Sequence, residues 1–157
     1  MEIIDLLAPE AVYLSIKAQS KRQLLQELAV RASQLTGLPE QRIAETLIER
    51  ERLGSTGMGQ GIAVPHGRIA GLGRIVGLFA RLEPPISYDA VDERPVDLVF
   101  LLLAPEGAGA DHLKALARVS RMLRNQVTCE KLRAAKNREV LYALLTEKSN
   151  GQGAQAA

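Results

Sequence analysis

The sequence of 157 residues has no tryptophan, only three tyrosines and two phenylalanines, one cysteine and two histidines. So few aromatic side chains argue against nucleic-acid recognition by base stacking, and they require a core built mainly from Leu, Ile, Val and Ala. The single cysteine, Cys129, excludes an intramolecular disulfide and cannot supply a metal cluster. This cysteine usage is typical of a protein in a reducing compartment.

The sequence also lacks an excess of either charge and a long apolar run. Twenty Lys and Arg against 18 Asp and Glu leave a formal net charge of +2, without the basic patch of a nucleic-acid or membrane binder. The longest apolar stretch, residues 98–104, is far shorter than the roughly 20 residues of a membrane span. Residues 1–7 carry two acids and no base, which does not favour export. We predict a cytoplasmic protein with no membrane insertion and no nucleic-acid partner.

Apolar side chains at intervals of three and four predict helices along much of the chain. Residues 20–35 have this spacing, with Ser20 placed to cap a helix and Gly37 placed to end it. A second helix is predicted from about Pro39 to Gly54, and a third begins at Asp111 as its cap. Two shorter helices are predicted at residues 129–135 and 138–146.

Two segments have the composition of strands, residues 75–82 and residues 96–104. The second is apolar almost throughout, as expected of a strand covered on both faces, so helices must cover the sheet and the fold is α/β. The connection through Pro84, Pro85 and the acids up to Asp97 is predicted to be solvated and without chemistry. Residues 150–157 have nothing to bury and are predicted to be a disordered tail.

A glycine-rich segment, residues 54–67, contains five glycines among 14 residues and ends near His66. This composition predicts a loop that turns sharply or approaches a ligand closely, although residues 62–64 could form a short strand. The second histidine, His112, stands at the predicted start of a helix. Without further context, a lone histidine is more often a structural residue than a functional one.

Glycine amides and the positive end of a helix near His112 would together form an anion site suited to phosphate. Arg50 and Arg68 flank the loop in sequence and could bind phosphate oxygens, although solvated surface arginines are an equally good interpretation. A neutral imidazole has a free ring nitrogen that can accept and pass on a phosphoryl group, which makes His66 the candidate nucleophile. The helix dipole would either keep His112 neutral or, if that ring is protonated, let it neutralise the phosphate.

Other sites are not supported by the sequence. Residues 57–61 lack the spacing of a dinucleotide fingerprint, no glycine precedes a Lys-Ser or Lys-Thr pair, and no His-x-x-x-His or cysteine cluster suggests a metal. The residues themselves leave two function classes open. One is phosphoryl transfer at His66, and the other is a binding module that holds a phosphorylated ligand without covalent chemistry.

The segment RERLGSTGMGQGIAVPHG, residues 50–67, resembles the active-site segment of the bacterial phosphotransferase-system (PTS) IIA family of the fructose, mannitol and nitrogen-regulatory class. The resemblance continues to residues 132–135 and covers nearly the whole chain. It implies one type-2 IIA domain, residues 1–149, with a central mixed β-sheet sandwiched between helices.

The resemblance also implies roles for individual residues. His66 would be phosphorylated, His112 would be the second active-site histidine, and Arg50 would be the active-site arginine. We expect Ser55 and Thr56 to help bind the phosphoryl group, and no metal or organic cofactor is implied. The phosphoryl donor would be a small histidine phosphocarrier protein of the HPr or NPr type, itself charged from phosphoenolpyruvate by an enzyme I.

The residue pattern at 54–59, and the lack of an attached carrier or membrane domain, are most similar to the nitrogen-regulatory branch of this family. The resemblance implies that such a protein regulates partners, including potassium-transport and sensor systems, through its phosphorylation state. The alternative is a sugar-specific IIA component of the fructose or mannitol type, which passes its phosphate to a IIB domain for transport.

Overall fold

The apolar run near residue 100 forms strand β6 (Val96–Pro105) at the centre of a computed structural model that describes residues 1–148. Its side chains alternate between two hydrophobic clusters, with even positions from Leu98 to Leu102 in one cluster and odd positions from Val99 to Leu103 in the other. This period of two, buried on both sides, confirms the prediction of a strand covered on both faces. The tail predicted at residues 150–157 lies outside the described residues.

The sheet has six strands in the order β1-β5-β6-β3-β2, and β4 also pairs with β6. Strand β5 runs antiparallel to β6, whereas β1 is parallel to β5, and β3 and β4 are parallel to β6. The predicted mixed sheet is therefore confirmed. The other strands are β1 (Val12–Ile16), β2 (Gly57–Gly59), β3 (Ile62–Ala63), β4 (His66–Ile69) and β5 (Val76–Ile86).

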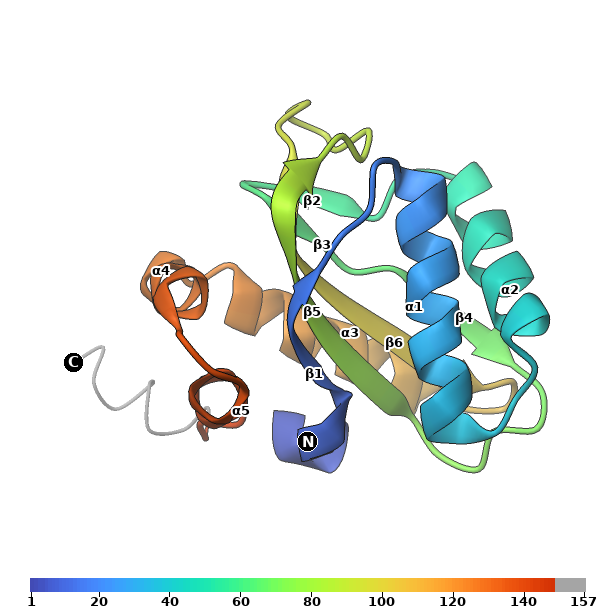
Figure 1. Cartoon of the computed structure of the whole chain (residues 1–157). Coiled ribbons are helices and arrows are strands. Elements are labelled where there is room, and N and C mark those ends of the chain that lie inside the picture. Colours follow the sequence, from blue (N-terminus) through green and yellow to red (C-terminus); the bar gives the residue numbers. More distant parts are fainter. Residues whose placement is uncertain (149–157) are drawn as a thin grey trace.

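Helices cover both faces of this sheet (Figure 1). Helices α1 (Lys21–Thr36) and α2 (Glu40–Arg52) lie together on one face. Helices α3 (Ala110–Leu123), α4 (Gln126–Ala134) and α5 (Arg138–Leu145) lie on the other. Two short 3-10 helices, Ile3–Asp5 and Pro9–Ala11, precede β1. The α/β sandwich in one domain matches the prediction, and no helix within residues 1–148 is long and apolar enough to cross a bilayer.

The predicted signals at the ends of α1 are confirmed in detail. The Ser20 hydroxyl accepts a hydrogen bond of 3.1 Å from the Gln23 amide, and Gly37 ends the helix with a left-handed φ of +76°. The predicted cap of α3 is wrong. Its first residue is Ala110, preceded by Gly109, and Asp111 instead lies in the first turn, where its carboxylate suits the helix dipole.

Several strands differ from the sequence predictions. The glycine-rich segment predicted as a loop contains β2, and this strand has glycine at position 57 because a Cβ there would lie only 2.9 Å from Ala90. Strand β5 continues to Ile86 and takes in Pro84 and Pro85, which were assigned to a solvated connection. Strands β1 and β4 were not predicted, because both are short and depend on parallel pairing with strands far along the chain.

Candidate functional site

Strand β4 directs His66 and Arg68 toward the face of the sheet that α3 covers. His66 pairs with Leu102 of β6, whose side chain belongs to the cluster on that face. Residues two apart on a strand share a face, so Arg68 points the same way. Gly67 between them faces α2, where a Cβ would lie 2.6 Å from the Thr46 methyl group. The glycine therefore lets α2 approach β4 closely behind the histidine.

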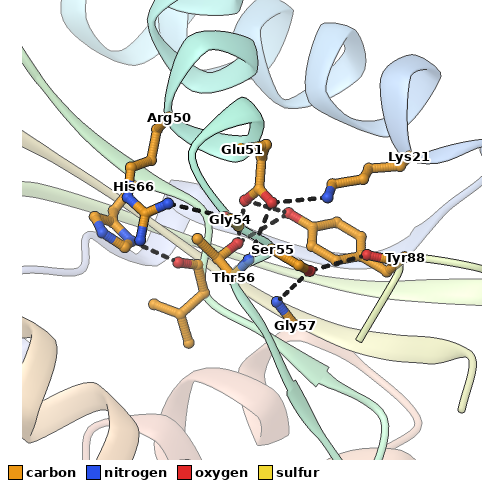
Figure 2. Close-up of polar contacts among 10 residues, drawn as sticks. Lys21, Arg50, Glu51, Gly54, Ser55, Thr56, Gly57, His66 and Tyr88 are labelled. Atoms are coloured by element: carbon orange, nitrogen blue, oxygen red, sulfur yellow. Dashed lines mark hydrogen bonds and ion pairs between the residues drawn. The ribbon is translucent and has the colours of Figure 1, made fainter. Parts of the chain in front are cut away.

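The His66 ring is held by one hydrogen bond, 2.8 Å between its Nδ1 and the Val64 carbonyl oxygen (Figure 2). A carbonyl can only accept, so Nδ1 carries the hydrogen and Nε2 of the neutral ring keeps its lone pair. Burial lowers the pKa of His66, and the Arg50 charge lowers it further, against the opposing effects of the Val64 bond and Glu51. The ring is therefore a neutral imidazole near pH 7 with a nucleophilic Nε2.

His112 lies on the first turn of α3 beside His66, with 5.6 Å between the ring centroids and 69° between the ring planes. The ring is buried, and Arg68 Nε donates a hydrogen bond of 3.1 Å to its Nδ1. Burial lowers the pKa of His112, and the nearby His66 and Arg68 lower it further. Of the two states that the sequence left open for His112, this environment favours the neutral ring.

Arg50 approaches His66 from the last turn of α2. Figure 2 shows Arg50 and Glu51 leaving this turn in different directions, Arg50 toward His66 and Glu51 toward Tyr88. Arg50 Nη1 donates a hydrogen bond of 2.9 Å to the Gly54 carbonyl oxygen, which fixes the guanidinium to the start of the glycine-rich segment. The structure thus gathers two histidines and two arginines, Arg50 and Arg68, at one site.

Ser55 and Thr56 make contacts away from the histidines, with Tyr88 and Glu51 (Figure 2). The Ser55 hydroxyl donates to the Tyr88 carbonyl oxygen and accepts from the Gly57 amide, both at 3.0 Å. The Thr56 amide donates to Glu51 at 3.0 Å, and its hydroxyl contacts the same carboxylate. Both side chains therefore hold the loop in shape, and their predicted part in phosphate binding stays a prediction.

A buried polar group that the sequence did not reveal organises this loop; we call Lys21, Glu51, Thr56 and Tyr88 the Glu51 cluster. The Glu51 side chain, 6% exposed, accepts hydrogen bonds from the Tyr88 hydroxyl at 3.0 Å and the Thr56 amide, and pairs with Lys21 Nζ at 2.9 Å. Burial alone would raise the pKa of Glu51, but hydrogen bonds from Thr56 and Lys21 outweigh it, so the pKa is lowered. The carboxylate is therefore ionised near neutral pH.

In the sequence, only Tyr88 indicates this cluster, as an aromatic residue among the acids of a connection that is predicted to be solvated. Tyr88 is 1% exposed, and Lys21 Nζ lies 4.6 Å from the centre of its ring. Such a contact combines a cation with the negative face of the ring. The acids Asp89, Asp92 and Glu93 are exposed, as predicted for the rest of that connection.

The donor set around His66 suits an anion. The Arg50 guanidinium and the ring N–H of His112 can only donate to a phosphoryl oxygen, and the neutral imidazole of His66 lies beside them. Within residues 1–148, His, Cys, Asp and Glu side chains do not gather in groups of three that could hold a metal ion. The arrangement is therefore suited to nucleophilic attack on, and electrostatic stabilisation of, a phosphoryl group.

Comparisons with known proteins identify relatives of this chain. A nitrogen regulatory protein of Bradyrhizobium diazoefficiens is 55% identical over 145 residues, which are 92% of this chain and 95% of that protein. A nitrogen regulatory protein of Escherichia coli is 38% identical over 148 residues, which are 94% of this chain and 91% of that protein. The crystal structure of nitrogen regulatory protein IIA-Ntr from Neisseria meningitidis has a TM-score of 0.87 at 36% identity, covering 92% of this chain and 99% of that one.

The resemblance to this family, and its particular similarity to the nitrogen-regulatory branch, is thereby confirmed. The match to the family extends from residue 5 to residue 148, nearly the whole of the described chain. This protein belongs to the family described as phosphoenolpyruvate-dependent sugar phosphotransferase system, EIIA 2.

Proposed function

We propose that this PTS IIA protein accepts a phosphoryl group on Nε2 of His66 and regulates partner proteins by its phosphorylation state. The observation that carries the proposal is the hydrogen bond between Nδ1 of His66 and the Val64 carbonyl oxygen. The Val64 carbonyl holds the hydrogen on Nδ1, and Nε2 keeps a lone pair among cationic and N–H donors. A binding module without covalent chemistry would not need a half-buried imidazole in this state.

The transfer step balances without a separate acid or base. The lone pair of His66 Nε2 attacks the phosphorus of a donor phosphohistidine, the N–P bond of the donor breaks, and the donor nitrogen keeps the electron pair. His66 then carries the phosphoryl group on Nε2 and a hydrogen on Nδ1. The Val64 carbonyl oxygen stabilises the positive charge of this ring. A cationic ring leaves as a neutral imidazole, which makes it a good leaving group for onward transfer.

Arg50 and His112 would stabilise the three phosphoryl oxygens in transit, together with amides of the glycine-rich segment. Phosphoryl transfer depends mainly on such positioning and electrostatics. Ser55 and Thr56 would act through the shape of the loop or through their amides, because their hydroxyls already contact Tyr88 and Glu51. The proposal requires no metal and no organic cofactor.

The proposed donor is a histidine phosphocarrier protein of the HPr or NPr type. Regulation of partners, with potassium-transport or sensor systems as candidates, is favoured by the names of the relatives, which are nitrogen regulatory proteins over nearly their full length. The proposed location is the cytoplasm, where such a carrier would meet this protein.

The direct test is to incubate the protein with phosphoenolpyruvate, enzyme I and the carrier, and to follow its mass. We expect one added phosphoryl group that is lost in acid, and phosphorus NMR should assign it to Nε2. His66→Gln should abolish the label, and His112→Gln should accept it slowly. Equal labelling of His66→Gln, or attachment at Nδ1, would overturn the assignment.

A second experiment separates regulation from sugar transport. Phosphorylated protein is mixed with purified IIB domains of the fructose and mannitol type, and the label on each chain is followed. The regulatory proposal expects the label to stay on His66 over the time in which a sugar-specific IIA protein is discharged. Rapid discharge to a IIB domain would contradict the regulatory proposal and indicate a role in sugar transport.

A further inference from the structure

We propose that Arg68 is a positioning residue that fixes the tautomer of His112, so that His112 serves only as a hydrogen-bond donor and His66 alone can be the nucleophile. The effect on transfer rests on the proposed function of His66. The tautomer itself is a property of the unphosphorylated protein and can be measured without any transfer.

One hydrogen bond determines the tautomer of His112. Arg68 Nε lies 3.1 Å from Nδ1 of His112, and a guanidinium has donors but no acceptor. Nδ1 must therefore accept, and the hydrogen of the neutral ring must sit on Nε2. The two adjacent histidines thus hold opposite tautomers, because a carbonyl faces Nδ1 of His66 and an N–H group faces Nδ1 of His112.

The other ring nitrogen of His112, Nε2, is left without a partner among the described residues. The side chain is only 5% exposed, and within residues 1–148 its buried Nε2 has no hydrogen-bond partner. Buried donors without a partner are rare in native proteins and call for a specific reason. The neighbouring ring is that of His66, 5.6 Å away between centroids, so an oxygen of a phosphoryl group on His66 could reach this N–H.

The two imidazoles differ in whether a nitrogen lone pair is free to attack. His112 has no free lone pair, because Nδ1 accepts from Arg68 and Nε2 carries the hydrogen. His66 has one on Nε2. Arg68 stands two residues after His66 on β4 and faces the same side of the sheet, so a single strand presents the nucleophile and orients its neighbour. Residues that orient a functional histidine through its second nitrogen act in this way at metal sites.

Two variants of Arg68 separate its hydrogen bond from its charge. Arg68→Met keeps the side chain as far as the position of Nε, where a methyl group replaces the donor. Arg68→Gln is uncharged and places an amide nitrogen at the position that Nε occupies in arginine. Nitrogen-15 NMR of the unphosphorylated proteins reports the tautomer and protonation of His112, and the rate of labelling by the carrier reports the consequence.

In the native protein we expect His112 as the pure Nε2–H tautomer with a hydrogen-bonded Nδ1. Arg68→Met should lose the shift of the bonded Nδ1, show a fraction of the Nδ1–H tautomer, and accept phosphate roughly ten-fold more slowly, as for other residues that orient a histidine. Arg68→Gln should restore the tautomer and most of the rate.

Unchanged nitrogen shifts of His112 in Arg68→Met would overturn the inference, as would equal losses in the two variants. Failure of the proposed function looks different. In that case no carrier labels even the native protein, while the nitrogen shifts still decide whether Arg68 sets the tautomer.

Discussion

The two sides of His66 differ in how completely their polar groups are paired. On one side, in the Glu51 cluster, Tyr88, Thr56 and Lys21 all contact the Glu51 carboxylate, and this side chain is almost entirely buried. On the other side, His112 is equally buried, yet its Nε2 lacks a partner among the described residues. Both sides are built from polar groups removed from water, which are costly unless paired.

This difference separates stability from function within one site. A paired buried carboxylate shapes the loop of residues 54–57 and, through the Gly54 carbonyl, the position of Arg50. An unpaired buried donor lowers the free energy of unfolding and is suited to bind a group that arrives later. We therefore expect changes in the Glu51 cluster to lower the free energy of unfolding, and changes around His112 to act mainly on phosphoryl transfer.

The largest expected effect is that of Glu51→Ala. Removing this carboxylate leaves Lys21 without its ion-pair partner and the Tyr88 hydroxyl without its acceptor, and breaking a buried pair costs about 3–5 kcal/mol. Urea unfolding should show a decrease of this size. The matched control is Glu49→Ala on the same helix, whose exposed pair with Arg52 should be worth less than about 1 kcal/mol. Similar losses in both variants would remove the distinction.

A smaller effect is expected for Tyr88→Phe. The change removes only the hydroxyl that donates to Glu51, and a hydrogen bond to a charged group contributes about 1.5–3 kcal/mol. The ring and its contact with Lys21 remain. Tyr13→Phe is the control, because Tyr13 is half-buried and its hydroxyl forms no hydrogen bond within residues 1–148. A loss for Tyr88→Phe no greater than for Tyr13→Phe, by the same unfolding measurement, would mean that the hydroxyl contributes little.

The fold was predictable where the signals are local. Helix α1 has its own cap, its own apolar spacing and its own terminating glycine, and β6 is apolar enough to require cover on both faces. Strand β4 could not be predicted, because its four residues include His66 and Arg68, and its hydrogen bonds come from parallel pairing with β6. A strand of four residues is too short for an alternating apolar pattern to be recognised in the sequence.

The site was likewise predictable only where the signals in the sequence are local. His66, His112 and Arg50 were singled out from a motif and a helix start, and the structure places them together. The bond from Tyr88 to Glu51 joins residues 37 positions apart, and that from Arg68 to His112 joins residues 44 positions apart. The sequence does not reveal such partners, because the identity of a residue does not show whether its side chain is buried or exposed.

The pH dependence of stability should separate the two sides, because their groups titrate in different ranges. Both histidines have lowered pKa values, so as pH falls below about 6.5 the unfolded chain binds protons first, and the free energy of unfolding decreases. Glu51 also has a lowered pKa, so its contribution is present above about 4.5 and is lost only as pH falls further.

Urea unfolding at several pH values between about 7.5 and about 5 measures the first range. The double variant His66→Gln, His112→Gln should show a flatter curve there and keep the steeper loss below about 4.5. An unchanged slope between about 7.5 and about 5 would show that other groups account for it.

The smallest expected change in stability is that of Arg68→Met. Arg68 is exposed and gives His112 one hydrogen bond, whose net contribution is about 0.5–1.5 kcal/mol, and loss of the side chain lets water approach Nδ1. The free energy of unfolding should therefore fall by about 1 kcal/mol or less, in the same variant whose phosphoryl transfer slows roughly ten-fold. A loss comparable to that of Glu51→Ala would make Arg68 a structural residue, and the two sides of His66 would then no longer differ in kind.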